Sequence, residues 1–211
     1  MKVKICGLTR QEDALFAAEC GADFLGFIFV EDSPRFMDAD RVAEIANAVR
    51  ARSNPPKLVG VFRDASLERM RDVASRATLD LIQLHGTERD DDIRSLLARQ
   101  GEVDGIPAIK TLHVSAELPD TAAHTNASWL LFDTYNDRLA GGTGKRFDWS
   151  LLTRYERTKP FFLSGGITPE NAAVAISTVR PDAIDLASGV ESSPGVKDHA
   201  KIAQLFERVK P

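Results

Sequence analysis

The chain has 211 residues, 43% of them hydrophobic and 27% charged, and a formal net charge of -4. We expect residues 1–211 to fold as one globular domain, because this length can bury a substantial core. Without a basic excess, neither a nucleic acid nor an anionic membrane surface is an expected partner, and no apolar run is long enough for a signal peptide or a membrane span. A cytoplasmic protein that binds a small molecule is therefore predicted.

Short apolar segments alternate with longer segments of helical periodicity along the chain. Most of the short segments are apolar throughout, which is typical of parallel strands covered on both faces. The predicted strands are 3–6, 24–29, 58–62, 81–84, 108–112, 129–132, 161–163 and 183–186. The predicted helices are 9–20, 39–51, 66–77, 88–99, 169–178 and 198–210. This order indicates repeated strand–helix units of an α/β protein.

Capping residues precede three of the predicted helices. Asp38 and Ser66 stand where their side chains can accept hydrogen bonds from the first backbone amides of the helices that follow. Thr168, followed by Pro169, predicts another helix start, because proline suits the first helical position.

Eight strands in one chain of this length leave about 26 residues for each strand–helix unit, so most connections must be short. An open doubly wound sheet commonly has about five or six parallel strands and would need longer units. We therefore predict a closed (β/α)8 barrel, a TIM barrel. The connections 30–37 and 133–147 are longer than the others. Both follow strands at the end where barrel active sites lie, so we expect them to cover a substrate.

Cys6 ends the first predicted strand, and Gly7 lets the chain turn sharply and leave the sulfur near the barrel mouth. As a general base, Cys6 would need a nearby positive charge or backbone donors that hold part of the thiol as thiolate. The alternative is a buried thiol that packs as a small hydrophobic group, which is how we interpret Cys20. Two cysteines do not make a disulfide framework, so reduced thiols are expected.

Asp133 follows the apolar segment 129–132 and brings a carboxyl group to the same end of the barrel. In a closed and poorly hydrated site its pKa would rise, which is the condition for a general acid near neutral pH. The alternative is a carboxylate that only caps the following loop by accepting backbone hydrogen bonds.

Two small-residue turns follow the last two predicted strands. The first contains Ser164, Gly165 and Gly166, and the second contains Ser188 and Gly189. In many barrels these two loops bind a phosphate through backbone N–H groups, which requires glycine for close approach. Either turn alone could be a tight connection, but the pair in these loops favours a phosphate site.

Three further charged or titratable residues lie near predicted strand ends. Arg35, in connection 30–37, either grips a ligand carboxylate through its planar fork or lies solvated on the surface. His85 ends the fourth strand and contacts either the ligand or a neighbouring loop. Asp185, near the end of the eighth strand, is expected to hold loop backbone rather than to transfer protons.

The sequence predicts neither a metal site nor a nucleotide-binding loop. The other histidines, His113, His124 and His199, show no metal-ligand spacing. The glycine-rich segment 140–145 fits neither the P-loop nor the dinucleotide fingerprint. We interpret it as a mobile loop that closes over a bound ligand.

Together these segments resemble the phosphoribosylanthranilate isomerases, a family of phosphate-binding (β/α)8 barrels. The resemblance spans nearly the whole chain and rests on an ordered set of motifs at successive strand ends. The motifs are KICGLTR at 4–10, SPR at 33–35, QLHG at 83–86, DT at 133–134, GGTG at 141–144 with FDW at 147–149, SGG at 164–166 and DLASGVE at 185–191.

The resemblance implies an Amadori rearrangement in tryptophan biosynthesis that needs no metal or organic cofactor. It converts N-(5-phosphoribosyl)anthranilate to 1-(2-carboxyphenylamino)-1-deoxyribulose 5-phosphate. By the same resemblance, Asp133 protonates the ribose ring oxygen and Cys6 removes the proton on C2. The glycine turns would bind the phosphate, and Arg35 would contact the carboxylate or the ring of the anthranilate. The sequence does not assign an oligomeric state.

Two other functions compete with this expectation. The histidine-pathway isomerases run the same rearrangement on a related barrel, but that family has an aspartate where this chain has Cys6. A catalytically silent barrel that only binds a sugar phosphate is the alternative from another class. Retention of both candidate proton-transfer residues argues against it.

Overall fold

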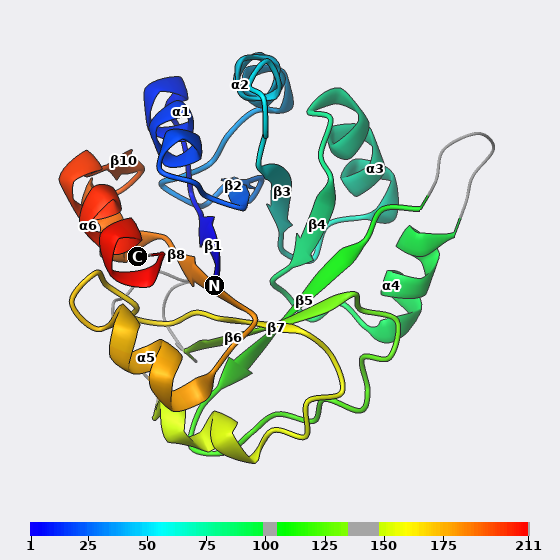
Figure 1. Cartoon of the computed structure of the whole chain (residues 1–211). Coiled ribbons are helices and arrows are strands. Elements are labelled where there is room, and N and C mark those ends of the chain that lie inside the picture. Colours follow the sequence, from blue (N-terminus) through cyan, green and yellow to red (C-terminus); the bar gives the residue numbers. More distant parts are fainter. Residues whose placement is uncertain (99–104, 135–147, 211) are drawn as a thin grey trace.

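The computed structural model of the chain describes residues 1–98, 105–134 and 148–210. Eight parallel strands close into a barrel in sequence order, with helices around the outside (Figure 1). The strands are β1 (Lys2–Ile5), β2 (Phe24–Ile28), β3 (Lys57–Phe62), β4 (Leu81–Leu84), β5 (Ala108–Val114), β6 (Trp129–Thr134), β7 (Phe161–Leu163) and β8 (Ala183–Leu186). The predicted (β/α)8 barrel is confirmed.

The helices lie where the sequence periodicity places them, with bounds that differ by a few residues. They are α1 (Gln11–Glu19), α2 (Ala39–Arg50), α3 (Leu67–Arg76), α4 (Asp90–Leu97), α5 (Ala172–Val179) and α6 (His199–Val209). Residues 115–128, between β5 and β6, contain no helix, and the short 3-10 helix η1 (Trp149–Arg154) precedes β7. Within the described ranges, no helix is both long and apolar enough to cross a membrane.

Two of the three predicted caps are confirmed. The side chain of Asp38 accepts a hydrogen bond from the amide of Asp40, and that of Ser66 accepts one from the amide of Arg69. The cap predicted at Thr168 is wrong, because α5 begins only at Ala172. The amide of Thr168 donates instead to the side chain of Asn171, so residues 168–171 form a separate turn before the helix.

Closure of the barrel depends on the pairing of its first and last strands. In this parallel pair Lys4 lies opposite Asp185, and Ile5 lies opposite Leu186. Because all strands run in the same direction, their carboxyl ends share one rim, which is the end that carries the active site in barrel enzymes.

The barrel interior is apolar at one level and polar at the next. Seven inward residues from β2 to β8 form the apolar level: Phe24, Val59, Leu81, Ile109, Leu131, Phe162 and Ala183. Side chains alternate between the two faces of a strand, so a residue two positions farther along points into the barrel again. Gln83, Thr111, Asp133 and Asp185 stand in these next inward positions, and the polar level therefore begins directly above the apolar one.

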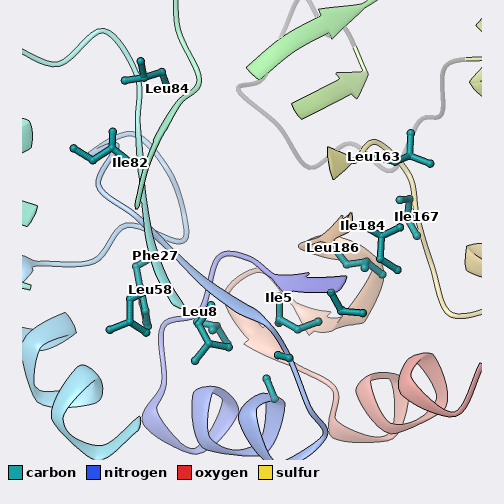
Figure 2. Close-up of a cluster of buried hydrophobic side chains, with 14 of the residues drawn as sticks. Ile5, Leu8, Phe27, Leu58, Ile82, Leu84, Leu163, Ile167, Ile184 and Leu186 are labelled. Carbon is teal, nitrogen blue, oxygen red and sulfur yellow. The ribbon is translucent and has the colours of Figure 1, made fainter. Parts of the chain in front are cut away.

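The opposite faces of the strands pack against the helices. Figure 2 shows part of this larger buried cluster, with Ile5, Phe27 and Leu58 from the strands and Leu8 from the loop before α1. The apolar layers on both faces of the sheet explain why the strand sequences are apolar throughout rather than alternating.

We expect Phe162→Ala to lower the free energy of unfolding by about 3–5 kcal/mol, since it removes a fully buried ring from the barrel interior. Val174→Ala, at a side chain that is 60% exposed, is the matched control and should change it by less than about 0.5 kcal/mol. Urea unfolding followed by circular dichroism measures both. Equal midpoints for the two variants would contradict the assignment of Phe162 to the core.

Candidate active site

A buried lysine lies at the centre of the polar rim. Lys4 is fully buried, and its Nζ donates to Cys6 Sγ at 3.2 Å, to Gln83 Oε1 at 2.7 Å and to Asp185 Oδ1 at 3.0 Å. Burial opposes the charge, but Asp185 and Cys6 outweigh it and raise the pKa of Lys4 above its ordinary value. Lys4 is therefore an ammonium, and its three protons match its three acceptors.

The position of Asp185 differs from the sequence-based expectation, and Lys4 is an additional residue of the candidate site. Asp185 was expected to hold loop backbone, but its carboxylate instead forms a buried ion pair with Lys4. The expectation was wrong because barrel closure places the two residues directly opposite each other, 181 positions apart in the sequence. Sequence reasoning did not single out Lys4 as a site residue, although a lysine at an inward position of an apolar strand was a signal for it.

Cys6 is buried beside a positive charge, as the predicted role of a base would require, because the Lys4 ammonium contacts its sulfur. Burial nevertheless raises the pKa of the Cys6 thiol above its ordinary value, and Lys4 offsets only part of that shift. Burial therefore disfavours the expected partial thiolate, and Lys4 favours it.

Asp133 lies in the last part of β6, with its side chain 15% exposed. Burial raises the pKa of Asp133 to about 6, although the amide of Thr134 donates to Oδ1 at 2.8 Å and opposes that shift. The carboxyl group thus keeps a proton in a useful fraction of molecules near neutral pH, in agreement with the predicted rise.

Two histidines lie beside Asp133. His85 Nε2 is 3.8 Å from Asp133 Oδ2, and the rings of His85 and His113 meet edge to face with their centroids 5.0 Å apart. Burial lowers the pKa of both, that of His85 to about 3, so both imidazoles are neutral at physiological pH.

The fold places His113 near potential metal ligands, which sequence spacing did not suggest. One ligand atom each from His85, His113 and Asp133 lies within 4.8 Å of the others. Sequence spacing could not reveal this group, because its members lie in or directly after three neighbouring strands. The available signal was their common inward phase: His85 follows Gln83, and His113 follows Thr111, by two positions.

The two predicted phosphate turns lie against each other. Gly165 and Gly166 adopt left-handed backbone angles, with φ of 84° and 70°, and Asn171 Nδ2 donates to the carbonyl of Gly166. Gly189, in the short 3-10 helix η2 (Ser188–Val190), approaches the carbonyl of Ile167 so closely that a Cβ atom would collide with it. Ser188 and Gly189 therefore share one rim segment with the turn after β7.

Arg35 already uses its planar fork within the protein. Its Nε and Nη2 donate to the two carboxylate oxygens of Glu191 at 2.8 and 2.7 Å, and Lys197 Nζ donates to Glu191 at 2.9 Å. Neither Glu191 nor Lys197 was singled out from the sequence. The ion pair between Arg35 and Glu191 links connection 30–37 to the segment after β8. The Arg35 side chain also packs over Gly7, which follows Cys6 in the sequence. The bidentate face that was predicted to grip a ligand carboxylate is therefore occupied by Glu191.

Two of the sequence predictions lie outside the described residues. The glycine-rich segment 140–145 is one, and the connection 133–147 is described only at Asp133 and Thr134.

Comparisons with known proteins agree with this geometry. A family model described as N-(5'phosphoribosyl)anthranilate (PRA) isomerase matches residues 3–208. An N-(5'-phosphoribosyl)anthranilate isomerase from Pseudomonas fluorescens (strain Pf0-1) is 42% identical over 215 residues, which cover 100% of this chain and 98% of that protein.

Solved structures give the same result. The phosphoribosyl anthranilate isomerase from Thermus thermophilus is 34% identical, with a TM-score of 0.87 over 99% of this chain and 98% of its own. A phosphoribosyl anthranilate isomerase in complex with reduced 1-(o-carboxyphenylamino)-1-deoxyribulose 5-phosphate is 36% identical, with a TM-score of 0.82 over 100% of this chain and 98% of its own. The chain therefore belongs to the N-(5'-phosphoribosyl)anthranilate isomerase family.

Proposed function

We propose that Cys6 is the general base and Asp133 the general acid of this chain's isomerase reaction. The enzyme converts N-(5'-phosphoribosyl)anthranilate to 1-(2-carboxyphenylamino)-1-deoxyribulose 5-phosphate in tryptophan biosynthesis, which is the activity of its family. The observation that carries the assignment is the contrast between two groups on one rim, the partly buried Asp133 and the buried Cys6. Asp133 holds a proton up to about pH 6, and Cys6 is a thiol next to an ammonium.

The acid acts first. Asp133 gives its proton to the ring oxygen of the ribose as the bond between that oxygen and C1 breaks, and the lone pair of the anthranilate nitrogen forms the C1=N bond of a Schiff base. A carboxyl group with a pKa of about 6 is suited to this step, because it is partly protonated near neutral pH and still acidic enough to donate.

The base acts on the opened sugar. Cys6, as thiolate, takes the proton from C2, and the electrons of that C–H bond form the C1=C2 bond of an enolamine as the C1=N electrons return to nitrogen. The enolamine then loses its hydroxyl proton and gains a proton at C1, which gives the ketone. Lys4 stabilises the thiolate by direct contact, and this contact offsets part of the cost of ionising a buried sulfur.

The remaining predicted site residues would bind the two ends of the substrate. Gly165, Gly166, Ser188 and Gly189 present backbone donors to the phosphate. Arg35 binds the anthranilate through Nη1, from which no described residue accepts a hydrogen bond, while Glu191 holds the rest of the guanidinium. His85 lines the site beside Asp133. A relative crystallised with the reduced product analogue supports a site for both a phosphate and a carboxyphenyl group.

We expect Cys6→Ser to lower kcat by about 100-fold or more, because a serine hydroxyl is far less ionised than a thiol in the same place. Loss of phosphoribosylanthranilate fluorescence measures turnover, and circular dichroism should show unchanged folding. Cys20→Ser is the matched control, since this partly buried cysteine follows α1 and should keep full activity. Wild-type turnover by a folded Cys6→Ser variant would exclude Cys6 as the base.

We expect Asp133→Asn to lose about 100- to 10,000-fold in kcat while it still binds substrate, because the amide cannot supply the proton. Stopped-flow fluorescence separates binding from turnover. The silent sugar-phosphate-binding alternative makes a different forecast: wild type would bind phosphoribosylanthranilate without consuming it. Turnover of the histidine-pathway intermediate at a comparable rate would favour the other isomerase family.

The raised pKa of Asp133 also predicts a pH-dependent stability. The folded protein binds this proton more tightly than the unfolded chain, whose carboxyl has the ordinary value of 3.8. Ionised Asp133 therefore opposes folding fully well above pH 6, and it has no effect well below pH 3.8, where both states are protonated. Asp133→Asn should be more stable than wild type at about pH 8, by on the order of 1–3 kcal/mol, and equal to it at about pH 3.

Urea unfolding at the two pH values tests this difference. Asp32→Asn is the control, because the Asp32 side chain is 90% exposed and its replacement should give a difference close to zero at both. A stabilisation by Asp133→Asn that is the same at both pH values would contradict the raised pKa.

A further inference from the structure

Gln83 connects the two halves of the active site. Its side chain, 2% exposed at an inward position of β4, accepts a hydrogen bond from Lys4 Nζ at 2.7 Å through Oε1. Its Nε2 lies 3.2 Å from Thr111 Oγ1 and 3.2 Å from His85 Nδ1. A continuous series of contacts thus runs from Cys6 through Lys4, Gln83 and His85 to Asp133.

The Lys4 ammonium fixes the orientation of the Gln83 amide. An ammonium group only donates hydrogen bonds, so the oxygen of the amide must face it, and the NH2 group must face the other two partners. Lys4 stays charged because Asp185 and Cys6 surround its Nζ. A flipped amide would set NH2 against NH3+ in a fully buried place, which leaves donors without acceptors.

The amide orientation in turn fixes the tautomer of His85. Gln83 Nε2 donates, so His85 Nδ1 must be the acceptor nitrogen. A neutral imidazole carries a single N–H hydrogen, which then sits on Nε2, the nitrogen that faces Asp133 Oδ2 at 3.8 Å. His85 is neutral because burial and the nearby His113 lower its pKa to about 3.

We propose that Gln83 is a positioning residue of the isomerase, which holds His85 as the Nε2–H tautomer so that His85 can donate a hydrogen bond to the carboxylate formed at Asp133. This inference rests on the proposed role of Asp133 as acid. The separation of 3.8 Å between His85 Nε2 and Asp133 Oδ2 is too long for a hydrogen bond. The contact shortens when Asp133 releases its proton, because a carboxylate attracts an N–H group more strongly than a carboxyl group does.

The same tautomer argues against metal binding by His85, His113 and Asp133, despite the short distances between their ligand atoms. A metal on His85 Nε2 would move the imidazole proton to Nδ1, where it would face the NH2 group of Gln83. Relief by rotation of the amide would break its bond to Lys4. The surroundings of His85 therefore favour a hydrogen-bond donor over a metal ligand.

The test combines ring-nitrogen NMR with kinetics on the full chain. In 15N-histidine protein, long-range 15N–1H correlation distinguishes protonated from unprotonated ring nitrogens, and the spectrum of His85→Gln identifies the signals of His85. We expect Nε2–H in wild type. In Gln83→Glu, a carboxylate faces both Lys4 and His85, so the proton should move to Nδ1. We expect kcat to fall by about 10- to 100-fold, the value of one hydrogen bond to a charged group, with KM changed less than about twofold.

A double-mutant cycle separates this effect from a direct effect on Cys6, since the new carboxylate also lies next to Lys4. In a His85→Gln background, the side chain at position 85 offers an amide N–H that no tautomer controls. Gln83→Glu should then reduce kcat by less than about threefold if it acts through His85. An equal loss in both backgrounds would show that the effect passes through Lys4 and Cys6 and would overturn the proposal.

Two other results would also overturn the proposal. One is a wild-type spectrum with the His85 proton on Nδ1, and the other is a shifted tautomer in Gln83→Glu with unchanged kcat. Failure of the proposed function can be distinguished from failure of this inference. If Asp133 is not the acid, Asp133→Asn keeps its turnover. The tautomer of His85 is measured from the NMR spectrum and does not depend on any activity.

Discussion

The site depends on the three hydrogen bonds that the buried Lys4 ammonium donates. Desolvating a charge costs several kcal/mol, so a fully buried lysine persists only where acceptors surround it. Here one carboxylate, one amide oxygen and one sulfur do so. Each contact has its own consequence. Asp185 neutralises the ammonium charge, and the Gln83 amide is held with its oxygen toward Lys4. Cys6 lies next to the positive charge that its ionisation requires.

Barrel closure and the formation of this centre are the same structural event. The pairing of β1 with β8 sets Lys4 opposite Asp185, so the ion pair forms only when the last strand joins the first. The apolar level below, which includes Phe24, Leu131 and Phe162, excludes water from one side of the polar level. The low polarity that raises the pKa of Asp133 and of Cys6 therefore follows from the packing that stabilises the barrel.

Two carboxylates on one rim differ in role because their surroundings differ. Asp185 lies 3.0 Å from an ammonium, whereas Asp133 accepts a single described amide hydrogen bond and lies beside neutral imidazoles. The first is suited to balancing charge and the second to exchanging a proton. Arg35 shows the same principle, because Glu191 accepts hydrogen bonds from its Nε and Nη2 and thereby links two rim segments. What each charged residue does is decided by its nearest partner.

The sequence by itself determined the eight strands, the six helices, two of the caps and the rim position of Cys6, Asp133 and the glycine turns. These features depend on local periodicity and on residue types at strand ends, which adjacent residues encode. Only the tertiary structure decided the partners of Asp185 and Arg35, the approach of His113 to Asp133 and the rise in the pKa of Cys6. Ion pairs across long sequence separations depend on strand register and closure, and desolvation depends on how completely the packed chain excludes water. Neither quantity is a property of a local segment.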